Sequence, residues 1–202
     1  MKFFDSGLME RERPLLEAVE KEFFSNSPIH YDIKLEGQRI NDQQEYVLGL
    51  FAGPHIRVDH LFHEMGHFAE REIPKLLEKP NRGWGFSLGG YWEIAGKSGC
   101  EPTTDQATQR EIRAMAYQLS ILRHYKKQVR PYFIAVVLRW MPDFHVFKYK
   151  VLGNEECSRL GYVESEKKAI EWAAKKIDEL SRTTFTFEAF RQAWDDRIQL
   201  LS

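Results

Sequence analysis

The chain of 202 residues has little of what marks several large protein classes. Its 2 cysteines, Cys100 and Cys157, are too few for a disulfide framework, which favours a reducing compartment. The longest apolar run, residues 132–138, is far shorter than a bilayer span. The N-terminus carries no apolar stretch of signal-peptide length. We therefore expect a cytoplasmic protein without a membrane partner.

An excess of one charge sign is also missing, since 29 Lys and Arg face 30 Asp and Glu. A net charge of −1 supplies no general attraction to nucleic acid, so we expect no nucleic-acid partner. One local exception is a basic and aromatic cluster. We interpret it as the solvated C-terminal end of a helix, with contact to nucleic acid or an acidic partner as the alternative. The cluster comprises Arg123, His124, Tyr125, Lys126, Lys127, Arg130 and Tyr132.

Hydrophobic residues make up 43% of the chain and include 14 Phe, enough for a sizeable core. Apolar periodicity predicts helices at 8–24, 59–72, 103–127, 131–140, 165–180 and 187–201. Alternation predicts strands at 31–35, 46–51 and 84–91, and a hairpin of 144–152 with 157–163. The expected class is α+β, helix-dominated with a small β-sheet. Residues 1–142 form the expected main domain, and 143–202 the hairpin and two helices packed on it.

One segment has a pattern of specific chemistry. Residues 63–67 read H-E-M-G-H, a match to H-E-x-x-H. On a helix, His63 and His67 project from one face and can share a Zn²⁺ ion, while Glu64 lies beside them. On the helical wheel these three join an arc that is polar throughout, opposite an apolar arc. The alternative is an ordinary solvent-exposed face on which the histidines are incidental.

A catalytic zinc site needs three protein ligands and an open position. The best third candidate is Glu111, a carboxylate within a stripe of small and apolar residues on the helix predicted at 103–127. Burial of a carboxylate is costly unless it is paired, protonated or bound to a cation. Ala107 and Ala114, one turn to either side, would allow a close approach to the metal helix. A buried Arg partner for Glu111 is the plain alternative.

Other side chains are supporting or rival candidates. Glu70 lies on the polar arc and is better suited to contact a metal-bound histidine than to bind the metal. Glu93 is a rival ligand, with a strand-end salt bridge as its alternative. Asp59 and His60 are candidates to orient the histidines, although N-capping explains Asp59 equally well. The candidate donors to a developing oxyanion are Tyr91, Tyr117 and His124.

The H-E-x-x-H helix resembles that of the zincin metallopeptidases. The metzincin extension is absent, because neither its Gly nor its His follows His67. The resemblance implies the gluzincin arrangement, with one Zn²⁺ per chain held by His63, His67 and Glu111. It also implies a zinc-dependent metallopeptidase that hydrolyses peptide bonds in a protein or peptide substrate, with Glu64 as general base on a metal-bound water.

Two narrower families share part of this pattern. Ala114 and Tyr117 after Glu111 are similar to the ligand helix of the ImmA/IrrE-type peptidases, although the 44-residue gap from His67 is longer than expected there. SprT-like proteins use a third His, and the downstream His124 and His145 are poorly placed by spacing.

A catalytically silent zincin-like protein that binds or inhibits a partner is the alternative function, although binding alone gives no reason to keep Glu64. For the enzyme, the resemblance implies that a peptide pairs with a sheet edge near the metal. Segment 84–91 is the candidate edge, because Gly85, Ser87 and Gly89 leave one face clear. Close packing of that face against a helix is the alternative. The sequence names neither the substrate nor the oligomeric state.

Overall fold

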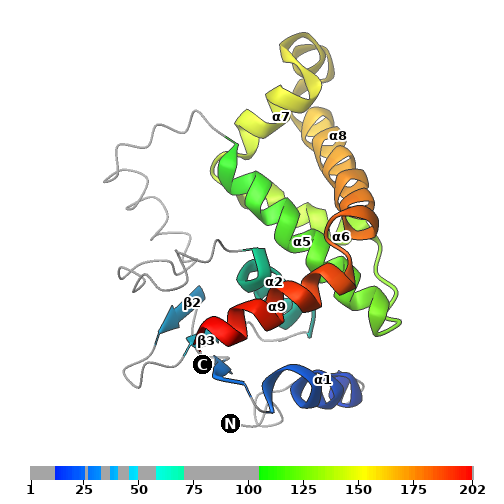
Figure 1. The fold of residues 1–202 in the computed structure, drawn as a ribbon. Coiled ribbons are helices and arrows are strands. Elements are labelled where there is room, and N and C mark those ends of the chain that lie inside the picture. Colours follow the sequence, from blue (N-terminus) through cyan, green and yellow to red (C-terminus); the bar gives the residue numbers. More distant parts are fainter. Residues whose placement is uncertain are drawn as a thin grey trace. The chain divides into compact units, whose positions relative to one another are not determined.

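The computed structural model describes residues 12–25, 27–32, 37–40, 46–49, 58–70 and 105–201. Helices predominate over strands among them (Figure 1). The chain forms two compact units, one of Met1–Ile94 with Arg191–Ser202 and the other of Ala95–Phe190. These limits differ from the boundary expected at 142/143. No helix in the described ranges is long and apolar enough to cross a membrane.

The first unit begins with a helix and a small sheet. Helix α1 (Arg13–Val19) has Pro14 in its first turn, which suits the fixed φ of proline, and continues into the π-helical segment η3 (Glu20–Phe24). Strand β3 (Tyr46–Gly49) lies between β1 (Ile29–Asp32), which is parallel to it, and β2 (Gly37–Ile40), which is antiparallel. The helix expected at 8–24 and the strand expected at 46–51 are confirmed over their described residues. The other expected strand begins two residues earlier than predicted, and β2 was not predicted.

Aromatic packing around Trp194 forms much of the core of this unit. Trp194 is 2% exposed and lies on α9 (Phe187–Leu201), in the part of that helix that belongs to the first unit. Its ring makes edge-to-face contacts with Phe23, Phe24 and Phe68, at centroid distances of 5.0 to 5.5 Å. Such contacts stabilise beyond the burial of apolar area. The three partners come from segments that are distant in sequence, so Trp194 joins α9 to both η3 and the helix that contains Phe68.

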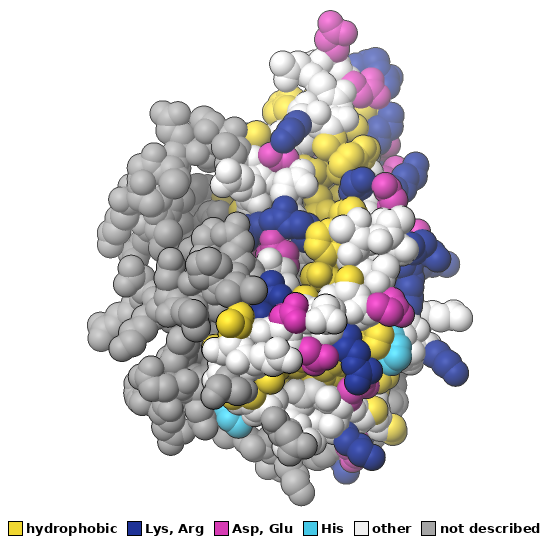
Figure 2. Space-filling view, in the orientation of Figure 1, with side chains coloured by type: hydrophobic (Ala, Val, Ile, Leu, Met, Phe, Trp, Pro, Cys, Tyr) yellow, Lys and Arg dark blue, Asp and Glu magenta, His cyan; other side chains and the backbone are white. Residues whose placement is uncertain are grey.

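The second unit is built from helices in its described part. They are α5 (Gln106–His124), α6 (Pro131–Ala135), the 3₁₀ segment η4 (Val136–Trp140), α7 (Phe144–Leu152), α8 (Asn154–Thr183) and the first turn of α9. Helix α8 contacts α5, α6 and α7 and is the centre of the unit. Its outward side carries Lys, Arg, Asp and Glu side chains that are interleaved (Figure 2), with ion pairs such as Lys176–Glu179. This side of α8 is therefore an ordinary charged helix face.

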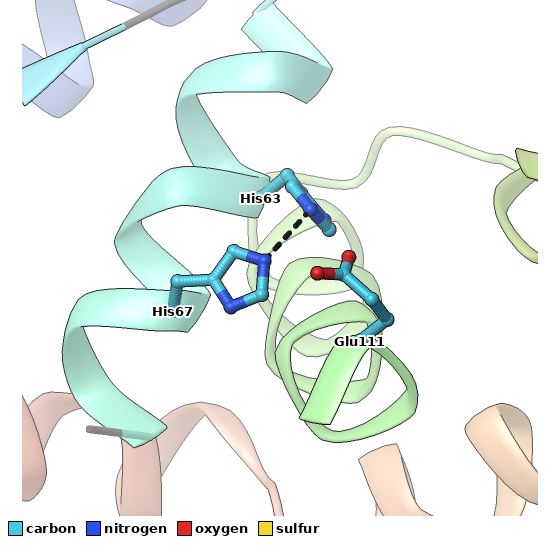
Figure 3. A group of neighbouring side chains, drawn as sticks. All are labelled: His63, His67 and Glu111. Atoms are coloured by element: carbon cyan, nitrogen blue, oxygen red, sulfur yellow. Dashed lines mark hydrogen bonds between the residues drawn. The ribbon is translucent and has the colours of Figure 1, made fainter. Parts of the chain in front are cut away.

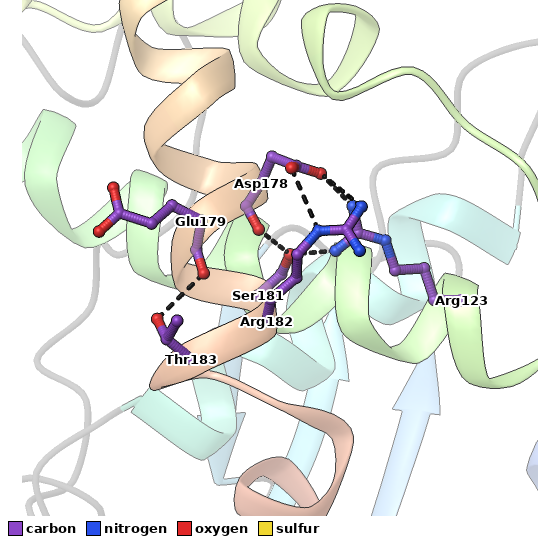
Figure 4. A network of polar contacts seen from close by, with 6 residues as sticks. All are labelled: Arg123, Asp178, Glu179, Ser181, Arg182 and Thr183. Carbon is purple, nitrogen blue, oxygen red and sulfur yellow. Dashed lines mark hydrogen bonds and ion pairs between the residues drawn. The ribbon is translucent and has the colours of Figure 1, made fainter.

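A polar network joins the C-terminal ends of α5 and α8 (Figure 4). Arg123 of α5 donates to the carboxylate of Asp178 and to the hydroxyl of Ser181. Arg182 Nε donates to Asp178 Oδ2 at 3.2 Å. Partial burial acts to raise the pKa of Asp178, but the hydrogen bonds from Arg182 and Arg123 outweigh it and lower the pKa. The network therefore favours the ionised carboxylate.

The hairpin predicted for 144–152 and 157–163 is wrong, because both segments are helical. Phe144, Phe147 and Lys148 are buried at helical spacing, and the Phe147 ring contacts Trp172 of α8 at 5.6 Å. Gly153, with φ of 82°, ends α7 and precedes α8 instead of forming a two-residue turn. A Gly-Asn pair is compatible with either role, and tertiary packing decides between them. The described part of the region after 143 therefore consists of helices and short connections between them.

Two predicted helix starts have different outcomes. The Thr186 cap of α9 is confirmed, since the Ala189 N–H donates to Thr186 Oγ1 at 3.2 Å. The start expected at Thr103 lies outside the described residues. Helix α5 begins at Gln106, and a carboxylate from elsewhere in the unit caps it: Asp143 accepts from the N–H groups of Ala107 and Thr108 at 2.9 and 3.2 Å.

The helix predicted at 131–140 is present as α6 followed by η4. Only one side of this segment is buried. Ile134, Ala135 and Leu138 are buried, whereas Phe133 and Trp140 are 65% and 63% exposed. Apolar residues all round a helix usually indicate burial on every side, so this segment departs from the normal pattern.

Candidate metal centre

Helix α2 (Val58–Glu70) carries the H-E-M-G-H motif. Its apolar residues, among them Leu61, Phe62 and Met65, are fully buried. All of its polar residues are at least partly exposed: Asp59, His60, His63, Glu64, His67 and Glu70. The predicted division of this helix into an apolar and a polar arc is therefore confirmed. The apolar arc fixes the rotation of the helix and so fixes the direction in which the motif faces.

The carboxylate of Glu12, the residue just before α1, binds the N-terminus of α2. The Val58 N–H donates to Glu12 Oε2 at 3.1 Å, and Glu12 is only 6% exposed. A negative side chain at this position satisfies a free N–H group and interacts favourably with the helix dipole. Asp59 lies in the first turn, after the start of the helix, so the proposed N-capping role does not apply to it.

The two motif histidines face each other from successive turns of α2 (Figure 3). Their Nε2 atoms lie 3.1 Å apart, and the ring centroids are 4.6 Å apart with planes at 85°. A single N–H···N hydrogen bond accounts for this distance if one ring is protonated at Nε2 and the other is not. The distance is explained equally well if the Nε2 lone pairs of both rings point toward one bound cation.

The distance between the rings fits a shared zinc ion. Zinc binds imidazole nitrogen at about 2.0–2.1 Å with tetrahedral angles, which places two such nitrogens about 3.3 Å apart. The observed separation of 3.1 Å is close enough to this value that a small rotation of either side chain removes the difference. Imidazole is also a ligand that zinc prefers. The pair therefore fits the metal in both geometry and chemistry.

Glu111 lies on α5 and is only 6% exposed. Thr108, Ala114 and Met115, which belong to the small and apolar stripe predicted around it, are buried as well. The Glu111 carboxylate is drawn with the two histidines in Figure 3. Because the histidines belong to the first unit and Glu111 to the second, ligation of one ion by all three enters below as a proposal.

The remaining candidates fall into two groups. His60 and Glu70 lie on the polar face of α2 with the motif, where they remain candidates to orient the histidines. Glu93, Tyr91 and the proposed edge strand at 84–91 lie outside the described residues.

Two candidate oxyanion donors, Tyr117 and His124, pack against aromatic rings. The Tyr117 ring is 7% exposed and packs edge-to-face on Phe185 and Phe190, at centroid distances of 4.9 and 5.8 Å. His124 stacks on Phe187 at 3.6 Å with planes 9° apart. It follows Glu111 by 13 residues on one helix, about 20 Å along the axis. His124 is therefore at the opposite end of α5 from the candidate ligand.

No protein-family model, curated protein or solved structure matches the chain. The candidate centre therefore rests on its own side chains.

Proposed function

We propose that the protein is a zinc-dependent metallopeptidase that hydrolyses peptide bonds in a protein or peptide substrate. His63, His67 and Glu111 are the proposed ligands of one Zn²⁺, and Glu64 is the proposed general base. The observation that carries the proposal is the 3.1 Å separation of the histidine Nε2 atoms on the polar face of α2. Glu64 follows His63 directly and is partly exposed.

The residues divide the chemistry between them. When bound, zinc would polarise the scissile carbonyl and lower the pKa of a water molecule. Glu64 would take the proton from the attacking water and pass it to the leaving amine. The histidines would bind the metal from successive turns of α2, and a set of three protein ligands would leave one position open.

Glu111 would complete the ligand set with a single negative charge. Two neutral imidazoles and one carboxylate leave a net positive charge around Zn²⁺, which favours the negative charge that develops during amide hydrolysis. This ligand set is the gluzincin arrangement implied by the resemblance to the zincins. The burial of Glu111 supports its role, because a carboxylate removed from water gains most from a cation.

A hydrolysis assay tests the proposal. Zinc-loaded protein should cleave dye-labelled casein or members of a random peptide library. Glu64→Gln keeps the shape of the side chain but removes the base, so it should bind as much zinc and cleave about 100-fold more slowly or less. Glu155→Gln, at an exposed position on α8, is the matched control and should leave cleavage unchanged.

Two outcomes contradict the enzyme. Equal cleavage by wild type and Glu64→Gln would mean that another activity is being measured. Zinc-loaded protein that cleaves neither casein nor any library peptide would favour the catalytically silent binding protein.

A further inference from the structure

An exposed apolar stripe runs along α6 and η4 in the second unit. Phe133, Val137 and Trp140 are 65%, 49% and 63% exposed. Val137 and Trp140 are three residues apart in the 3₁₀ segment η4, so they lie one turn apart on the same side, and Phe133 precedes Val137 by about one turn. Tyr132, at the start of the segment, is 36% exposed. The other side of the segment, with Ile134 and Leu138, is buried, and α6 packs on α8.

The composition of this stripe indicates a site that binds another molecule. Single exposed apolar side chains are normal on protein surfaces, but neighbouring large ones in a row mark interaction sites. Exposed Phe and Trp side chains raise the free energy of the protein relative to a state in which these side chains are buried. The segment already has a buried face that attaches it to α8, so folding does not require the second apolar face.

Along the sequence, the charged residues next to the stripe have one sign. From Ile112 to Pro142 the chain contains six Lys and Arg residues and no Asp or Glu. Lys126, Arg130 and Arg139 are exposed, and the Arg139 guanidinium lies 4.6 Å from the centre of the Trp140 ring. The first acidic residue after this segment, Asp143, is buried at the N-terminus of α5. The interleaved charges of α8 in Figure 2 form a contrast with this segment.

We propose that the stripe docks on the surface of an anionic membrane. Phe133, Val137 and Trp140 enter the headgroup layer, while Lys126, Arg130 and Arg139 contact anionic headgroups at its edge. Helical segments with Trp and Phe on one side and cations beside them bind membranes in this way without spanning them. A Trp with a guanidinium over its ring suits the boundary between water and lipid.

A lipid surface fits the stripe better than the other anionic partners do. Nucleic acid would pair with the cations and stack on the aromatic rings, but it offers no apolar environment for Val137. An acidic protein would need a groove shaped to one convex helix, whereas lipid adapts to it. The expectation of no membrane partner was based on the lack of a membrane-spanning run, which does not exclude docking on a membrane surface. The net charge of −1 is a whole-chain sum and does not reveal a segment of 31 residues without acids.

Vesicle sedimentation of the full chain tests the proposal. Wild type should bind vesicles of equimolar phosphatidylserine and phosphatidylcholine about tenfold or more tightly than vesicles of phosphatidylcholine alone. Phe133→Ser/Trp140→Ser and Arg130→Glu/Arg139→Glu should each reduce binding to the anionic vesicles about tenfold or more. Tyr162→Ser/Val163→Ser removes two side chains of α8 that are 73% and 78% exposed and should bind as wild type does. Circular dichroism and thermal unfolding show whether each variant is folded.

Three results would overturn the proposal. The first is a wild-type chain that stays in solution with anionic vesicles. The second is a folded Phe133→Ser/Trp140→Ser variant that binds as tightly as wild type, because the apolar stripe would then have no role. The third is tight binding of polyuridylate that both double variants weaken while vesicle binding stays weak, which would assign the surface to nucleic acid.

Discussion

The Nε2 atoms of His63 and His67 approach to 3.1 Å although their rings come from different turns of α2. Residues four apart on a helix are neighbours, but ring rotation allows many separations, so this one is informative. Both rings turn the same kind of nitrogen toward one point on the polar face. Either a proton shared by the two nitrogens or a cation bound by both explains this arrangement. Only the cation gives Glu64 a chemical task.

Glu111→Gln should lower zinc affinity about 100-fold or more, because the amide keeps the size of the side chain but loses the charge that binds the metal. Competition with a chromophoric chelator measures the affinity. Gln118→Ala is the control, since Gln118 lies on the same helix and is also 6% exposed. If Glu111→Gln binds zinc as wild type does, the third ligand lies elsewhere, with Glu70 and Glu93 as the next candidates.

Asp143→Ala should destabilise the protein by about 1–3 kcal/mol, because it leaves helix α5 without its cap. The Asp143 carboxylate is buried and accepts from two N–H groups and from the hydroxyl of Thr108, the last at 2.6 Å. Chemical denaturation measures the change. The exposed Asp195→Ala variant should unfold as wild type does, and equal stabilities for the two variants would refute the capping role.

Asp178→Asn should destabilise the protein at neutral pH and lose this effect in acid. Partial burial opposes ionisation of Asp178, but Arg182 and Arg123 lower its pKa below the ordinary 3.8. The ionised carboxylate therefore stabilises the fold fully above the ordinary pKa, and this stabilisation is lost as pH falls through the lowered pKa. For a partly exposed pair we expect about 0.5–1 kcal/mol. Urea unfolding from pH 7 down to pH about 3 checks this, and a difference that is constant over the range would contradict it.

Gly161→Ala should destabilise the protein by about 1–3 kcal/mol through the backbone alone. Gly161 interrupts α8 with φ of 73° and ψ of 176°, a conformation essentially restricted to glycine. The space where a Cβ would lie is open, so no steric clash contributes. Thermal unfolding measures the effect beside Ser158→Ala, an exposed position on the same helix. Equal melting temperatures would show that the kink is dispensable.

The sequence was most informative where the interactions are local. The two arcs of α2 follow from its apolar period, and the pairing of His63 with His67 follows from their spacing. The burial of Glu111 was predicted on the same basis, from its neighbours on α5. These features depend on residues within a few turns of each other, so a period in the sequence is enough to reveal them.

The failures occurred where distant residues decide. Asp143 caps α5 from 35 positions away, and Glu12 caps α2 from 46 positions away, and no local pattern announces either contact. The hairpin prediction for 144–152 and 157–163 failed because a Gly-Asn pair between two segments suits a hairpin turn and a helix end equally well. Packing of Phe147 on Trp172 selected the helix, and that contact joins residues that the sequence alone could not pair.

The metal content of protein purified without chelators tests the histidine site most directly, by mass spectrometry of the dissolved sample. We predict about one zinc per chain for wild type and for His145→Ala, which removes an exposed histidine of α7. His63→Ala and His67→Ala, when folded, should each retain about a tenth of that amount or less. Folded wild-type protein that takes up no zinc even when the metal is supplied, or a folded His63→Ala variant with as much zinc as wild type, would contradict the site.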